Sequence, residues 1–187
     1  MGFIRSFIPW IIFFILNSYQ LFFLGALLGL GFYIFSCIRN PHTLYVLDHL
    51  SAFFLMGLLM MIEFFHVTVL KNYTGTLGNG FLALYVFITI VINRPFTLSY
   101  AKKITPPEKW NSPHFLKINR WIAIVWLLYF FLSLPIMFFI SDQHPIDSQI
   151  LQWGLLLIAV VLTKKIPQWY LKAMGPKPMG QERVKLD

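Results

Sequence analysis

Long apolar runs recur along this 187-residue chain, and only short polar stretches separate them. A helix needs about 20 apolar residues to cross the hydrocarbon core of a bilayer, and several of these runs approach that length. The composition agrees, because 58% of the residues are hydrophobic and only 12% are charged. Soluble domains carry about twice that share of charge. These features exclude a soluble enzyme, a disordered chain and a nucleic-acid-binding domain, and we expect no nucleic-acid partner.

Five segments have the length and composition of membrane-spanning helices. The fifth is short, but Lys164 and Lys165 can bury their stems and extend it to the interface. We therefore expect an all-α, polytopic membrane bundle that forms one domain over residues 1–187. The five predicted spans are residues 21–38, residues 51–70, residues 81–92 with part of the Gly-rich stretch before them, residues 121–140 and residues 150–163.

The first apolar stretch, residues 7–16, is too short to be assigned with the others. A polar Asn-Ser-Tyr-Gln stretch at residues 17–20 separates it from the next span. It has one basic flanking residue, Arg5, and no small-residue cleavage site follows it, so we do not expect a cleaved signal peptide. We favour a re-entrant or interfacial helix here, which gives five full spans, and six spans remain the alternative.

The basic residues predict the orientation of the chain in the membrane. Lysine and arginine collect in the cytoplasmic loops of membrane proteins. Thirteen of the fifteen fall at residue 39, in residues 94–120 or in the tail 164–187, and these positions share one side of the predicted topology. The opposite side has only Lys71, and the side of Arg5 depends on the unassigned first stretch. We therefore expect the tail and the 94–120 segment to be cytoplasmic.

The longest polar element, residues 94–120, is basic, aromatic and punctuated by prolines. Pro95 can begin a short helix over residues 95–104, and Ser112 can cap a second helix that starts at Pro113. Such a surface anchors a protein to anionic lipid, or forms a docking site for a partner protein or a lipid headgroup. We expect the contacts to come from Arg94, Phe96, Tyr100, Lys102, Lys103, Trp110, Lys117 and Arg120, with Arg94 and Tyr100 at the centre.

One pair of ionisable residues, Glu63 and His66, lies within a predicted span. Their spacing places both side chains on one face of a helix. A Glu-x-x-His pair is half of a di-metal carboxylate site, and the chain has no second pair to complete one. The remaining alternatives are a single metal ion, a haem ligand at His66, a proton relay or a structural hydrogen bond. No cofactor is favoured, because polar groups commonly hold membrane helices together.

Two further features bear on packing and on chemistry. Gly25-x-x-x-Gly29 is a small-residue motif that lets a second helix approach closely. Asp48 lies near the start of a predicted span, where a carboxylate ordinarily caps the helix. Signatures of nucleophilic, phosphate-binding and zinc-protease chemistry are missing, so we expect no enzymatic activity.

Short motifs at both ends of the chain resemble the bacterial intracellular septation A family of small inner-membrane proteins. The resemblance rests on Phe7-Ile8-Pro9 at the start, on Pro113, Phe115, Lys117, Asn119 and Trp126 near the fourth span, and on Lys165-Ile166-Pro167-Gln168 after the last. It implies a non-enzymatic role in envelope organisation and division, through contacts with other membrane proteins. The alternative is a metal-binding, haem-binding or proton-coupled membrane protein that uses Glu63 and His66.

Overall fold

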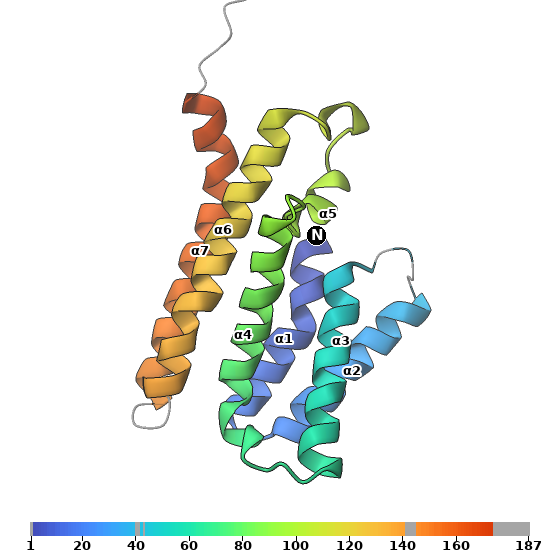
Figure 1. The fold of residues 1–187 in the computed structure, drawn as a ribbon, viewed down its shortest axis with the longest axis vertical. Helices are drawn as coiled ribbons and strands as arrows, with labels where there is room; N and C mark the ends of the chain where they lie inside the picture. Colours follow the sequence, from blue (N-terminus) through green and yellow to red (C-terminus); the bar gives the residue numbers. More distant parts are fainter. Residues whose placement is uncertain (1, 40–41, 43, 141–144, 174–187) are drawn as a thin grey trace, which may run out of the picture.

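The computed structural model describes residues 2–39, 42, 44–140 and 145–173, and all of its regular elements are helical. The long helices run up and down one bundle (Figure 1). Their bounds are α1 Gly2–Ser18, α2 Phe22–Arg39, α3 Val46–Leu59, α4 Leu70–Val91, α6 Pro113–Pro135 and α7 Pro145–Ala173. Between α4 and α6 lie the short α5 Thr97–Lys102 and a 3₁₀ turn at Pro107–Lys109. Two π-helical turns, Met60–Phe64 and Ile136–Ile140, extend α3 and α6.

The predicted all-α bundle is confirmed, with five helices long and apolar enough to cross a membrane. These are Phe22–Arg39, Val46–Phe64, Leu70–Val91, Pro113–Ile140 and Ile146–Ala173. The third is longer than predicted, because the Gly-rich stretch belongs to α4 and packs against its neighbours. An added Cβ at Gly78 would lie 3.1 Å from the rings of Phe14 and Trp10. The chain is therefore an integral membrane protein by the length and composition of its helices.

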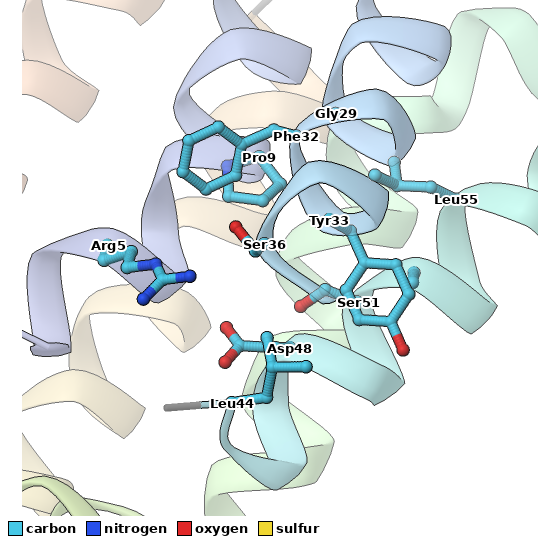
Figure 2. Close-up of a pocket in the computed structure, with 11 residues that line it drawn as sticks. Arg5, Pro9, Gly29, Phe32, Tyr33, Ser36, Leu44, Asp48, Ser51 and Leu55 are labelled. Atoms are coloured by element: carbon cyan, nitrogen blue, oxygen red, sulfur yellow. The ribbon is translucent and has the colours of Figure 1, made fainter. Parts of the chain in front are cut away.

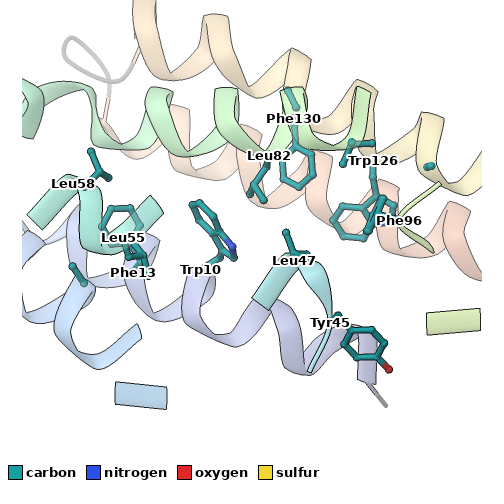
Figure 3. Close-up of a cluster of buried hydrophobic side chains, with 14 of the residues drawn as sticks. Trp10, Phe13, Tyr45, Leu47, Leu55, Leu58, Leu82, Phe96, Trp126 and Phe130 are labelled. Atoms are coloured by element: carbon teal, nitrogen blue, oxygen red, sulfur yellow. The ribbon is translucent and has the colours of Figure 1, made fainter. Parts of the chain in front are cut away.

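Helix α1, which contains the unassigned stretch 7–16, lies in the centre of the bundle. Trp10 and Phe13 are fully buried, and the Phe7 ring stacks on Trp126 of α6 with centroids 5.2 Å apart. Figure 3 shows the side chains of α1, α3, α4 and α6 meeting in one cluster. The end of α1 lies beside the start of α4, because Asn17 accepts a 2.8 Å hydrogen bond from Thr74. Residues 5–17 form an apolar helix shorter than the five candidate spans, so the re-entrant or interfacial placement and the six-span alternative both stay predictions.

Glycines of α2 allow α1 to pack this closely. An added Cβ at Gly25 would lie 3.2 Å from the Phe13 carbonyl oxygen, and one at Gly29 would lie 3.3 Å from the Pro9 carbonyl oxygen. The Gly25-x-x-x-Gly29 motif therefore packs helices within one chain. Gly31, two residues on, has nothing within 4 Å of the same position.

The described cations gather at one end of the bundle, which we call the basic end. It comprises the start of α1, the end of α2, the segment 94–120 and the last turns of α7 (Figure 1). Lys71, at the start of α4, is the one lysine or arginine of the described residues at the opposite end. Residues 174–187 of the predicted tail lie outside the described residues.

Candidate functional site

The segment 94–120 folds back onto the bundle as an ordered cap over the basic end. Helix α5 packs on α6 and on α1. Thr97 Oγ1 donates a 2.8 Å hydrogen bond to the buried carbonyl oxygen of Asn119 in α6. Ser112 caps α6 as predicted, since its hydroxyl accepts a 3.1 Å hydrogen bond from the Phe115 amide, and Pro113 is the first helical residue. These contacts hold the segment in one position relative to the bundle.

Two of the eight predicted contact residues anchor the segment instead of facing outward. Phe96 and Tyr100 are only 3% and 7% exposed, and both belong to the hydrophobic core. The Tyr100 ring lies 4.0 Å from the ring of Tyr45, and Phe96 lies 6.0 Å from Tyr85 of α4. Their aromatic rings face inward because α5 needs an apolar side to pack against the bundle. Tyr100 is therefore not the centre of a contact surface.

Burial also changes the acidity of Tyr100. Loss of water around the ring raises the pKa of the Tyr100 hydroxyl well above its ordinary value near 10, and the nearby Asp48 raises it further. The neighbouring Ser6 hydroxyl opposes part of this rise. The hydroxyl therefore stays neutral at physiological pH, consistent with an anchoring role.

The other predicted contact residues surround this anchor on the outside. Trp110 is half-buried and donates a 2.8 Å hydrogen bond from Nε1 to the Thr105 carbonyl oxygen. The Lys102 ammonium lies 5.2 Å from the Trp110 ring, and the Lys103 ammonium lies 4.2 Å from the Tyr45 ring. Such cation–π contacts hold the lysines near the surface without neutralising them. The exposed cations of the set are Arg94, Lys102, Lys103, Lys117 and Arg120.

An open groove of about 620 Å³ lies between the end of α4 and the first half of α6. Asn93 and Pro95 form one side of it. Six residues from one face of α6 form the other side, namely Pro113, Leu116, Lys117, Arg120, Trp121 and Ile124. Lys117 and Arg120 supply positive charge, and no acidic residue lines the groove.

A second, much smaller cavity of about 10 Å³ lies where α1, α2 and α3 meet, and it has room for one water. Figure 2 shows Arg5 of α1, Asp48 of α3 and Ser36 of α2 around the same space. Asp48 also caps α3 as predicted, because its carboxylate accepts a 2.7 Å hydrogen bond from the Tyr45 amide. The arrangement is suited to holding three helices together.

The structure does not place Glu63 and His66 on one helical face, so that prediction is wrong. The α-helix ends at Leu59, Glu63 lies in the π-helical turn, and His66 follows in a left-handed conformation with φ of 55°. Glu63 instead pairs with Lys71 of α4 at 3.1 Å, and both side chains are more than two-fifths exposed. Across the described residues, no group of three or more His, Cys, Asp or Glu side chains is arranged to hold a metal ion. A metal site shared by Glu63 and His66 therefore lacks the helical face on which it depended, while a haem ligand at His66 stays a prediction.

The groove contains residues that the sequence analysis did not select. Lys117 and Arg120 were predicted to bind lipid or a partner, while Asn93, Leu116, Trp121 and Ile124 were not. A helical stripe was present in the sequence, since positions 113, 116, 117, 120, 121 and 124 share one face of a helix. The contribution of Asn93 and Pro95, in the turn after α4, had no comparable signal, because it depends on how this turn lies against α6.

No protein-family model, curated protein or solved structure matches this chain. The resemblance to the septation A family therefore stays a prediction from short motifs.

Proposed function

We propose that this chain is a non-enzymatic protein of a bacterial inner membrane, with its basic end in the cytoplasm. There it contacts anionic lipid or a partner membrane protein through the exposed cations of residues 94–120. The clustering of described lysine and arginine residues at one end supports this orientation. Arg5, at the start of α1, lies at the same end.

The observation that carries the proposal is the anchoring of the 94–120 segment. Phe96 and Tyr100 bury their rings in the bundle core, and Thr97 bonds to α6. The cations between and after these anchors are therefore presented on a fixed surface. A preorganised surface loses less conformational freedom on binding than a flexible linker does, which favours a contact role for it.

The septation A resemblance gives this proposal a cellular setting. Proteins of that family are implicated in envelope organisation and division, and such a role requires contacts between membrane proteins. We propose the same role here, carried by the 94–120 surface.

Photo-crosslinking in living cells tests the proposal. A photoreactive residue replaces Glu108, which is exposed beside the lysines of the segment. We expect a crosslinked lipid or protein, and its loss when Lys102, Lys103 and Lys109 are all changed to alanine.

The matched control changes Lys164, Lys165 and Lys172 to alanine. This variant removes the same charge from exposed positions of α7 at the same end. We expect it to keep the crosslink. Equal amounts of crosslink in all three proteins, with normal membrane insertion, would contradict the proposed role of the segment.

A further inference from the structure

We propose that the groove between α4 and α6 binds one anionic glycerophospholipid. Lys117 and Arg120 hold its phosphate, and the acyl chains run along the apolar part of α6. This inference rests on the proposed function and adds to it a defined site and a defined ligand class.

Along α6, the groove passes from charged to apolar residues, as a lipid passes from its headgroup to its acyl chains. Lys117 and Arg120 come first, and Trp121 and Ile124 follow on the same helical face. From Lys117 to Ile124 the helix rises about 10 Å, so charged and apolar parts are separated by roughly the depth of a headgroup region. Trp121 is half-exposed at the point of change, as expected for an indole at a membrane interface.

The charge of the groove favours a phosphate group. Two of its eight lining residues are cations and none is acidic. The Arg120 guanidinium can donate two parallel hydrogen bonds to phosphate oxygens, and Lys117 adds a point charge.

The wall opposite α6 is rigid because α4 ends in a fixed turn. Asn93 adopts a left-handed conformation with φ of 55°, and the Arg94 amide donates a 3.0 Å hydrogen bond to the Thr89 carbonyl oxygen. This is the Schellman arrangement that closes many helices, and Pro95 follows it. The wall is therefore already formed, and binding does not have to order it.

The size and position of the groove fit a lipid better than a small anion. A hollow of about 620 Å³ takes a headgroup with its glycerol and the first part of its chains, and it is open on one side. Trp121 is 50% exposed, and the chains can lie against it and against Ile124 one turn further along α6. A free phosphate would leave this apolar surface uncovered.

Native mass spectrometry of the purified full-length protein tests the site with phosphatidylglycerol and phosphatidylcholine as probes. We expect preferential retention of phosphatidylglycerol. Lys117→Ala with Arg120→Ala should weaken that retention about tenfold, since each cation makes charge-assisted hydrogen bonds to phosphate. Lys164→Ala with Lys165→Ala removes the same charge from the same end, outside the groove, and should retain phosphatidylglycerol like the unchanged protein.

Arg120→Gln is measured as a second variant, so that the test does not depend on the folding of the double variant. This change keeps a long side chain at an exposed position and should still weaken retention several-fold. Melting temperatures of the lipid-free proteins show whether each variant is folded.

Three results would overturn the lipid site. If both double variants lose retention of phosphatidylglycerol equally, the lipid is held by diffuse attraction to the basic end and not by the groove. That result leaves the proposed function intact. Equal retention of phosphatidylcholine, which carries a phosphate but no net charge, would mean that the groove does not select an anionic lipid. Full displacement of phosphatidylglycerol by an equal concentration of glycerol phosphate would mean a site for small anions.

Discussion

The indole Nε1 of Trp10 donates a 2.6 Å hydrogen bond to the hydroxyl oxygen of Ser51, and both side chains are fully buried. Ser51 in turn donates a 2.6 Å hydrogen bond to the Leu47 carbonyl oxygen. This bond joins the middle of α1 to α3 in a part of the bundle that offers the indole no water. It shows that the first helix is a structural centre of the protein.

Trp10→Ala should destabilise the protein by about 3 kcal/mol, because it empties a fully packed site. Trp10→Phe keeps most of the ring contacts and loses the hydrogen bond, so we expect about 1 kcal/mol. Trp169→Ala is the control, because that ring is 53% exposed and should cost far less. Thermal unfolding in detergent compares the three variants. Equal melting temperatures for Trp10→Ala and Trp169→Ala would contradict a central α1.

Gly29→Ala should destabilise the contact between α1 and α2. The new Cβ would lie 3.0 Å from Leu55 Cδ1 and 3.3 Å from the Pro9 carbonyl oxygen, so a helix has to move. We expect a loss of about 1–3 kcal/mol by the same unfolding assay. Gly31→Ala, on the same helix with nothing nearby, should be neutral or slightly stabilising, since alanine favours helix. A similar loss of stability in both variants would mean that the cost of Gly29→Ala does not come from its close packing against α1.

Phe96→Ala should release the 94–120 segment from the bundle. Because its ring is buried in the core, its loss removes an anchor and exposes the backbone around Lys102, Lys103 and Lys109 to trypsin. We expect limited proteolysis at these lysines to become several-fold faster, as local opening becomes easier. Ile104→Ala is the control, because that side chain is 81% exposed. Unchanged cleavage in Phe96→Ala would show that the ring does not hold the segment.

The raised pKa of Tyr100 predicts a specific loss of folding stability at high pH. Its pKa is raised in the folded protein by burial, so above its ordinary pKa near 10 the unfolded state releases the proton and the folded state keeps it. Stability attributable to this group is complete below pH 10 and falls as the pH rises further. The melting temperature should therefore fall less between pH 8 and pH 11 in Tyr100→Phe than in the unchanged protein. The same fall in both would show that Tyr100 ionises equally in the folded and unfolded chains.

The spans and the start of α6 were predictable because each depends on local sequence. Apolar length identified the five long helices, and Ser112 with Pro113 located the start of α6. The central position of α1 was not predictable in this way. Lipid and protein interiors are both apolar, so hydropathy does not distinguish a ring that faces lipid from one, such as Trp10, that faces other helices.

In the candidate site too, features that depend on local sequence were predictable, and features that depend on packing were not. Arg94, Lys102, Lys117 and Arg120 were selected by charge, and the structure exposes them. The inward direction of Phe96 and Tyr100 depends on how α5 packs against α1 and α6, which the sequence of the segment does not contain. Glu63 and His66 were misplaced because the expected regular helix ends before them.

The proposed contact role of the basic end depends on the side of the membrane that this end faces. Thiol labelling of spheroplasts tests this directly, because the chain has one cysteine, Cys37, which Cys37→Ser removes. New cysteines then replace Asn72 at the opposite end and Lys109 at the basic end, both exposed positions. We predict that an impermeant reagent labels position 72 in intact spheroplasts and position 109 only after lysis. Labelling of position 109 before lysis, with position 72 protected, would contradict the orientation and the contact role built on it.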